Sequence, residues 1–347
     1  MFRTKTLFIV GAGASCELGL PSGQQLKNII ADNINIRFED GWRQSSGSHS
    51  ICDALREHAK YPDGRAGDIN PFLAAAWKIR DAMPHAISID NFIEAHQNDK
   101  RVELSGKLGI VDSILSAERA SNLYLRDFES KIPSAVFEKT WYGPFFQLLT
   151  ENVKREEISQ IFENITFVVF NYDRCLEHFL VNALQTYYAL PDIEAQALVS
   201  RLILYHPYGA VGKLPWQDRS SGVPFGAKID GRHLLRLANQ IRTFTERIEE
   251  ENILEEIRSL VQVAETVVFL GFAFHPMNMQ LLKGRKSSAA KKVFWTSLGI
   301  SSADHDEISA EILKVLKQKS QHVRISSLRN ISCSDLFYEF RRSLVAS

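Results

Sequence analysis

The sequence has few cysteines and no long apolar run. Among its 347 residues the only cysteines are Cys16, Cys52, Cys175 and Cys333, which are widely spaced and form no CxxC pair. This spacing argues against a structural zinc site and against a disulfide scaffold. No apolar stretch approaches the length of a membrane span, and the N-terminal apolar run is too short for a signal peptide. We therefore expect a cytoplasmic protein with no metal site and no membrane association.

The sequence also lacks an excess of either charge, since Lys plus Arg and Asp plus Glu both number 41. The balanced charge gives no reason to expect bulk electrostatic attraction to nucleic acid or to an anionic membrane, although it does not exclude a local basic patch. Hydrophobic residues make up 45% of the chain. That content and this length suffice for one large domain or two modest ones with a substantial core.

The first informative stretch, residues 7–23, reads LFIVGAGASCELGLPSG. Its apolar run Leu7–Val10 predicts a strand buried on both faces. Gly11 and Gly13 then allow a tight turn and a close approach to a ligand, and the amides of the next helical turn suit a pyrophosphate. The dinucleotide fingerprint GxGxxG is incomplete because Cys16 takes the place of its third glycine, so the motif alone is weak.

Further apolar runs predict five more strands, at residues 165–170, 202–205, 266–270, 293–296 and 323–325. Helical patterns accompany them, at residues 24–31, 174–188, 236–264, 303–319 and 336–344. Strands that alternate with helices predict an α/β fold, namely a Rossmann-like doubly wound parallel sheet.

Residues 31–159 do not continue this alternation. Residues 37–68 are polar and predict loops around one short helix near 51–59, and the chain then reads as helical to about 153. Within that part, 87–95 is expected to begin a helix with Ser88 or Asp90 as N-cap, and 108–132 forms another helical run. We therefore predict a discontinuous α/β domain (1–30 and 160–347) with a mainly helical inserted subdomain (31–159) and a Rossmann-like sheet.

Polar or glycine-rich clusters follow several of the predicted strands. They are GAGAS at 11–15, NYD at 171–173, HPYG at 206–209, GFAFHP at 271–276 and TSLG at 296–299. The carboxyl ends of parallel strands share one edge of a sheet, and ligands bind in the crevice beyond it. These clusters are therefore expected to converge on one site.

The clusters resemble motifs of the sirtuin superfamily, and more closely those of the sirtuin-like domains of prokaryotic anti-phage defence proteins that hydrolyse NAD. The matching residues are Gly11-Ala12-Gly13-Ala14-Ser15 (GAG-x-S), Gly19-Leu20-Pro21 (G-[IL]-P), Asn171 and Asp173 (N-x-D), His206 with Gly209 (HG), and Gly271, Phe272 and Phe274 (the turn facing the adenosine ribose). The resemblance covers about 1–30 and 160–330. Two features depart from it: Ser22-Gly23-Gln24 replaces the sirtuin D-F-R, and the CxxC pairs of the deacylase zinc module are missing.

The resemblance implies an NAD+ glycohydrolase that cleaves the nicotinamide–ribose bond and yields nicotinamide and linear or cyclised ADP-ribose. It implies that Asn171 positions water or a ribose hydroxyl, that Asp173 accepts from the carboxamide, and that His206 is the general base. The residues expected to hold NAD+ are Gly11, Ala12, Gly13, Ala14, Ser15, Pro21, Gly271, Phe272, Phe274 and Ser297. The pyrophosphate is expected on the amides of Gly13, Ala14 and Ser15. No cofactor beyond NAD+ as substrate and no metal is expected.

Alternatives stay open at this stage. Asn171 and Asp173 could only cap the following helix, His206 could be a hydrogen-bonded strand-end residue, and Asp90 is more often a cap than a catalyst. The chain could also be a non-catalytic NAD- or ADP-ribose-binding regulatory module, whereas the missing zinc module argues against a protein deacylase. The resemblance implies an NAD-depleting effector in anti-phage defence (abortive infection). Constant NAD+ hydrolysis would be toxic, so we expect the protein to be silent until its assembly state or a partner changes. The resemblance further implies a homo-oligomer and a separate partner protein, such as a DNA-translocating ATPase or a short Argonaute.

Overall fold

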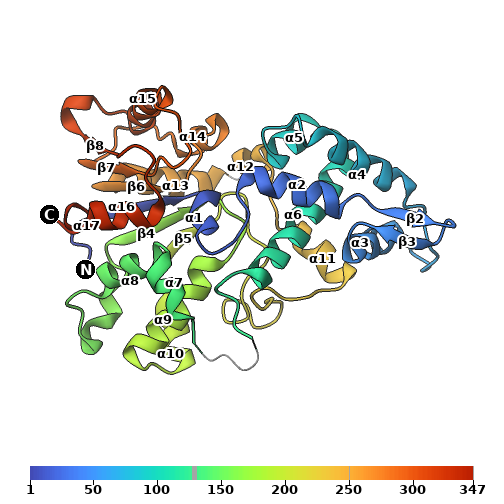
Figure 1. Cartoon of the computed structure of the whole chain (residues 1–347), viewed down its shortest axis with the longest axis horizontal. Coiled ribbons are helices and arrows are strands. Elements are labelled where there is room, and N and C mark those ends of the chain that lie inside the picture. The colour runs from blue at the N-terminus through green and yellow to red at the C-terminus, as the bar shows by residue number, and fades with distance from the viewer. Residues whose placement is uncertain (127–130, 250, 347) are drawn as a thin grey trace.

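The computed structural model describes residues 1–126, 131–249 and 251–346, which we call the described residues. They form two lobes that lie side by side (Figure 1). The sheet lobe contains a six-stranded sheet and both termini, and the helical lobe contains α2 to α6 with a small hairpin. No helix in these ranges is long and apolar enough to cross a membrane.

The sheet lobe is built on six parallel strands in the order β5-β4-β1-β6-β7-β8. The strands are β1 (Thr6–Val10), β4 (Ile165–Val169), β5 (Ile203–Tyr205), β6 (Thr266–Leu270), β7 (Lys292–Trp295) and β8 (Arg324–Ser326). If these six alone are numbered along the chain, the order is 3-2-1-4-5-6, which is the Rossmann arrangement. The predicted α/β class with a doubly wound parallel sheet is confirmed, and each predicted strand end lies within one residue of the observed one.

Strand β1 is the centre of the sheet. It pairs along its whole length with β4 on one side and β6 on the other, and all five of its residues are buried. Side chains alternate between the two faces of a strand. Accordingly, Leu7 and Ile9 belong to one hydrophobic core and Phe8 and Val10 to the other. The sheet is therefore covered on both faces, which explains why its strands read as continuous apolar runs.

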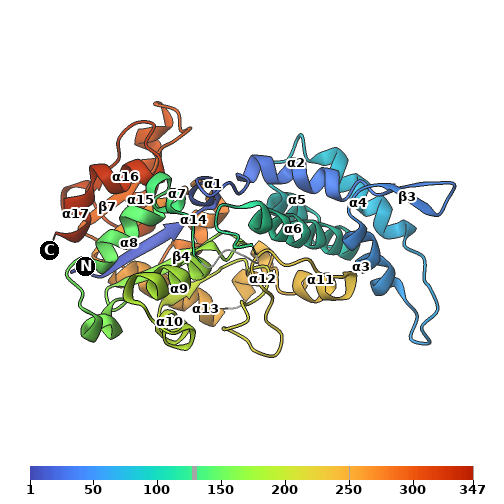
Figure 2. The ribbon, with the colours of Figure 1, turned by 60° about the horizontal axis from the view of Figure 1, so that its bottom comes forward.

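Helices cover the two faces of the sheet, as Figures 1 and 2 show. The face that carries Phe8 packs against α7 (Ser134–Lys139), α8 (Tyr142–Thr150), α9 (Cys175–Tyr188), α10 (Asp192–Val199), α16 (Cys333–Glu339) and α17 (Arg341–Val345). The face that carries Leu7 packs against α13 (Glu251–Val263), α14 (Pro276–Leu282) and α15 (Asp304–Leu316). Three short helices complete the lobe: α1 (Ala12–Cys16), η1 (Arg155–Gln160) and η2 (Ser320–His322).

The helical lobe is organised around α6 (Lys100–Ala120), which contacts most of its other helices. These are α2 (Gly23–Asn33), α3 (His49–Ala59), α4 (Asn70–Ala82), α5 (Ile89–Ala95) and α11 (Gly231–Ala238). Gly106 and Gly109 allow close packing, since a Cβ at either position would lie within 3 Å of an isoleucine side chain on α5 or α2. The lobe also carries α12 (Phe244–Glu249), which contacts α5.

Three predicted segments differ from the structure. Residues 37–68, predicted as loops with one helix, also contain an antiparallel hairpin of β2 (Arg37–Glu39) and β3 (Arg43–Ser46), whose polar strands give no apolar alternation. The single helix predicted over 236–264 is divided into α11, α12 and α13, because Ile241 turns into the core and the Arg242 N–H donates to the Tyr208 carbonyl. The helix predicted over 108–132 begins at Lys100 and ends at Ala120; residues 127–130 lie outside the described residues, as does 250.

The packing also differs from the predicted boundaries of the insertion, 31–159. Helices α7 and α8 fall within those boundaries but pack on the sheet, where Phe145 lies against Phe8. Conversely, α11 falls in the predicted α/β domain but packs against α3 and α6 of the helical lobe. The helical lobe is thus assembled from two separate parts of the chain.

Candidate functional site

The predicted clusters meet at the carboxyl edge of β1, β4, β5 and β6. The chain passes from β1 to β4 and β5 in one direction, then returns to place β6, β7 and β8 on the other side. The strand order therefore reverses between β1 and β6, and this switch point is where open α/β sheets bind ligands. On one side of this switch point polar residues that follow β1, β4 and β5 gather at the carboxyl edge, and we call them the candidate site: Ser15, Asn171, Asp173, Glu177 and His206.

The glycines at the switch point let two loops pack backbone against backbone. The N–H of Gly13 donates to the Gly271 carbonyl over 3.0 Å, and the N–H of Gly11 donates to the Leu270 carbonyl over 2.9 Å. Gly271 has φ +56°, and a Cβ there would lie 2.0 Å from the Ala14 nitrogen. The glycines that suggested a phosphate loop are therefore required first for the contact between the β1 and β6 loops.

This contact uses amides that were predicted to hold the pyrophosphate. The Gly13 amide is used by Gly271, and the Ala14 amide donates to the Gly11 carbonyl over 3.0 Å. The helix that follows, α1, has only five residues, and its dipole is correspondingly small. Two of the three amides predicted to hold the pyrophosphate are thus engaged within the protein.

Asn171 connects three elements of the candidate site. Its side-chain Nδ2 donates to the Gly11 carbonyl (3.1 Å) and to Ser15 Oγ (2.9 Å), and its backbone carbonyl faces His206 Nδ1 (2.9 Å). A carbonyl can only accept, so the Gly11 contact fixes which amide atom is the nitrogen. Asn171 Oδ1 has no partner among the described residues. Asn171 therefore keeps one acceptor for a ligand.

Asp173 is held from both sides. Its Oδ2 accepts from Ser15 Oγ over 2.9 Å, and its Oδ1 accepts from the Cys175 N–H over 3.2 Å at the start of α9. The side chain is buried, with 6% of the residue exposed. The bond from the Cys175 N–H is the kind of contact expected if Asp173 caps the following helix. The Asp173 carboxylate also orients the Ser15 hydroxyl, which accepts from Asn171 Nδ2. Each oxygen has one donor within the protein, and the predicted carboxamide contact stays a prediction.

His206 forms a pair that the sequence did not predict. Its Nδ1 lies 2.9 Å from the Asn171 carbonyl and its Nε2 lies 3.0 Å from Glu177 Oε1. Burial alone lowers the pKa of His206, but the Glu177 carboxylate and the Asn171 carbonyl raise it, and the net direction is upward. The Asn171 carbonyl can only accept, so Nδ1 is the donor in that contact, and Nε2 is paired with the Glu177 carboxyl group. Both ring nitrogens of His206 thus have partners within the protein, and its role as general base stays a prediction.

Glu177 is the member of the candidate site that sequence reasoning missed. It lies in the first turn of α9, six residues after Asn171, and its side chain is 7% exposed. Its neighbours on the helix, Leu176, Phe179 and Leu180, belong to the core. An acidic residue within such an apolar run is rarely buried without a partner, and that was the available signal.

The predicted ligand residues of β6 and β7 belong mainly to the core. Phe272 packs against Phe170 and Phe269, with ring centroids 5.1 and 5.6 Å apart, and Phe274 packs against Trp295 at 5.3 Å. Ser297 is 1% exposed, and its hydroxyl donates to the Leu328 carbonyl and accepts from the Ile331 N–H. Ser297 thus joins the β7 loop to the segment before α16 and does not face the other site residues with a free group.

Ala12 and Pro21, also predicted to hold NAD+, lie at or next to the starts of helices. Ala12 begins α1, and Pro21 precedes Ser22, which caps α2 in a reciprocal capping box with Gln25. The residues that replace the sirtuin D-F-R therefore serve to start a helix of the helical lobe.

The helical lobe reaches the candidate site through α5. Ser88 is the N-cap of this helix and accepts from the Asn91 N–H (3.0 Å), so Asp90 is free for another contact. The Tyr172 hydroxyl, next to Asn171, donates to Asp90 Oδ1. Burial raises the pKa of Asp90, although Tyr172 and His275 act in the opposite direction. This bond joins α5 to the loop that carries Asn171 and Asp173.

A buried ion pair anchors the same loop to α6. Arg174 and Glu118 have side chains that are 1% and 0% exposed, and their Nη2 and Oε2 atoms lie 2.5 Å apart. Glu118 also accepts from the Arg174 and Gly226 N–H groups, and Arg174 donates to two further carbonyls, of Val223 and Pro224. The pair is fully hydrogen-bonded, which is the condition under which such a pair is tolerated in a core.

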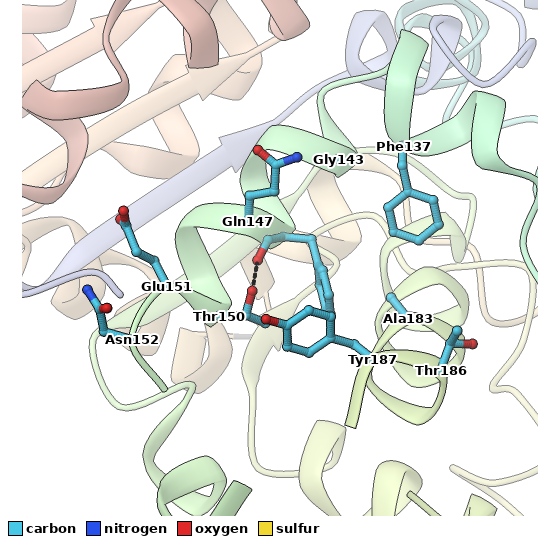
Figure 3. A pocket seen from close by; sticks show the side chains of 10 residues that line it. Phe137, Gly143, Gln147, Thr150, Glu151, Asn152, Ala183, Thr186 and Tyr187 are labelled. Carbon is cyan, nitrogen blue, oxygen red and sulfur yellow. Dashed lines mark hydrogen bonds between the residues drawn. The ribbon is translucent and has the colours of Figure 1, made fainter. Parts of the chain in front are cut away.

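A groove in the sheet lobe lies away from the candidate site. It has a volume of about 370 Å³ and is lined by residues of α8 and α9, among them Phe146, Gln147 and Tyr187 (Figure 3). Its lining contains none of the residues predicted to be functional. In the described ranges, no three His, Cys, Asp or Glu side chains are grouped to hold a metal.

Comparison with family models, curated proteins and solved structures finds no match to this chain. The strand order therefore defines the class, a Rossmann-like α/β protein, and the function rests on the chemistry of the candidate site.

Proposed function

We propose that the chain is an NAD+ glycohydrolase that cleaves the nicotinamide–ribose bond. The observation that carries the proposal is the position of Asn171, which bonds to the β1 loop and to His206 at the switch point and keeps Oδ1 free. A Rossmann-like sheet supplies a dinucleotide crevice at this place.

The reaction needs a fixed acceptor more than a strong nucleophile. Nicotinamide leaves as a neutral molecule when the bond electrons pass to its ring nitrogen, and water then bonds to the electron-poor anomeric carbon. Asn171 Oδ1 is suited to orient that water or a ribose hydroxyl. Ser15 and Asp173 would hold the amide in place through the contacts described above, acting as positioning residues.

The second candidate is a binding module for NAD+ or ADP-ribose without turnover. The observation in its favour is that Ser15, Asn171 and Asp173 satisfy one another, as residues with a purely structural role would. Under this reading the same crevice binds the nucleotide as a regulatory ligand.

The test is nicotinamide release from NAD+ by the purified chain, followed by chromatography. We expect Asn171→Ala to lower the rate at least about 100-fold while NAD+ still binds, because fixed positioning is lost. Asn98→Ala, at an exposed position, is the matched control and should keep the wild-type rate. A folded wild-type chain that binds NAD+ and leaves it intact, both alone and with the product of the neighbouring gene, supports the binding module instead.

The biological part of the proposal is NAD+ depletion as a response to phage infection. Unregulated cleavage would kill the host, so the proposal includes a silent state that a homo-oligomer or a separate partner relieves. The assay is therefore run on the chain alone and with the product of the neighbouring gene. An increase in nicotinamide release on mixing is the expected result.

A further inference from the structure

One carboxylate oxygen in the candidate site has no partner. Among the described residues, three buried side-chain atoms lack a hydrogen bond: Glu177 Oε2, Trp295 Nε1 and His305 Nε2. Trp295 and His305 lie against each other, with ring centroids 4.4 Å apart, at β7 and α15. Only Glu177 belongs to the candidate site, where its Oε1 is bound by His206 Nε2.

A buried carboxylate oxygen without a donor is costly, and natural structures keep such atoms mainly where water or a ligand completes them or where chemistry uses them. The Glu177 side chain is 93% buried, since 7% of it is exposed. Its Oε1 is paired with His206, whose other ring nitrogen is bound to the Asn171 carbonyl. The side chain with the free oxygen is therefore linked, through His206, to Asn171, the residue that orients the reacting groups in the proposed function.

The other acid and base atoms of the candidate site are already occupied. Both oxygens of Asp173 accept hydrogen bonds, and both ring nitrogens of His206 face acceptors. Hydrolysis of NAD+ releases one proton from water, and an acceptor is needed within reach of that water. Among the described residues, Glu177 Oε2 is the carboxylate oxygen of the candidate site that is buried and has no donor.

We infer that Glu177 is the proton acceptor of the proposed reaction, an assignment that rests on the proposed function. Water bonds through its oxygen to the anomeric carbon as the carbon–nitrogen bond breaks and its electron pair passes to nicotinamide. One water proton goes to Glu177 Oε2, and the carboxylic acid returns it to solvent after the products leave. His206 is a positioning residue that holds Glu177 by its other oxygen.

The test compares Glu177→Gln and Glu177→Ala with the wild-type chain. Glutamine keeps an oxygen that accepts from His206 but cannot take a proton, so nicotinamide release should fall at least about 100-fold with KM within threefold. The acid limb of the pH–rate profile should disappear in Glu177→Gln. Formate, a small carboxylate, should restore part of the rate of Glu177→Ala in proportion to its concentration. Glu194→Gln, exposed on α10, is the matched control.

Two results would overturn the assignment, and a third separates it from the proposed function. If folded Glu177→Gln releases nicotinamide within threefold of the wild-type rate, Glu177 does not take the proton. If Glu177→Ala is folded and inactive but formate restores nothing, its role is structural. If the wild-type chain releases no nicotinamide in any of these assays, the proposed function itself fails and the assignment falls with it.

Discussion

At the scale of single residues, the pKa values of two buried histidines, one in α9 and one just after β5, are shifted in opposite directions because their neighbours differ. His178 stacks on Phe225, with ring centroids 4.2 Å apart, and its Nε2 faces the Leu123 carbonyl. Burial lowers its pKa from the ordinary 6.5 to about 4. His206 faces a carboxylate, and its pKa is raised instead. The free energy of unfolding should therefore fall toward acid pH because of His178 and toward alkaline pH because of His206.

His178 should destabilise the fold in acid. The unfolded chain takes up a proton on this residue near pH 6.5 and the folded chain only near pH 4, so stability falls as the pH falls through this window. Between pH 7 and pH 4.5, the free energy of unfolding of His178→Gln should fall by about 2 kcal/mol less than that of the wild type. Urea unfolding at both pH values measures this, with the exposed His322→Gln as control. Equal losses in wild type and His178→Gln would contradict the prediction.

The stabilisation that His206 contributes to the fold should be lost at alkaline pH. Its folded pKa is raised, so the stabilisation is complete below the unfolded value near 6.5 and is lost as the pH rises through the folded value. Glu177→Gln removes the main favourable charge. The stability advantage of the wild type over this variant should therefore shrink between pH 6 and pH 9 in thermal unfolding scans. An advantage that is constant over this range would show that His206 is not held as a cation.

At the scale of elements, the strands were predictable and the contacts between their loops were not. The strands are buried on both faces, so their composition alone marks them. The glycines after β1 were predicted to approach a ligand, and they approach Gly271 instead, because a sequence gives no information about which loop faces which. Glu177 was missed for the same reason: its partner His206 is 29 positions away. The polar hairpin β2–β3 carries no apolar alternation and gave no signal.

The packing of these loops predicts a large effect at Gly271. Alanine there would meet the Ala14 nitrogen at 2.0 Å as well as a positive φ. Gly299 also has positive φ (+78°), but a Cβ there meets nothing within 4 Å. We expect Gly299→Ala to cost about 1 to 2 kcal/mol and Gly271→Ala more than about 3 kcal/mol. Denaturant unfolding of the two variants checks this. Similar costs would mean that the loops separate easily.

The buried pair between α6 and the β4–α9 loop predicts a comparable loss. Glu118→Gln leaves the Arg174 charge buried without compensation, which should cost about 3 to 5 kcal/mol. The matched control is Glu39→Gln, which breaks the exposed pair with Arg43 on the hairpin and should cost less than about 1 kcal/mol. Chemical unfolding compares them. A cost for Glu118→Gln as small as that of the control would show that the loop rearranges to expose Arg174.

At the scale of the whole molecule, the candidate site lies where the two lobes meet. The convergence of the strand-end clusters was predictable from the parallel sheet, since parallel strands share one carboxyl edge. The contribution of the helical lobe was not, because Asp90 is far from Tyr172 in the sequence and its helix position predicts a cap at least as well. The lobes are thus joined, among other places, at the loop that holds Asn171.

This connection predicts a local effect of Tyr172→Phe. The change removes the hydroxyl that donates to Asp90 and leaves a largely buried carboxyl with one donor fewer, so α5 should open more often. Amide hydrogen exchange, read by mass spectrometry, should become severalfold faster in residues 89–95 and stay unchanged in α8, which packs on the sheet. Tyr338→Phe, at a side chain that is 60% exposed, should change neither segment. If exchange in 89–95 stays at the wild-type rate, α5 is held by its other contacts, such as the one between Glu94 and Thr245, and the lobe junction does not depend on the tyrosine beside Asn171.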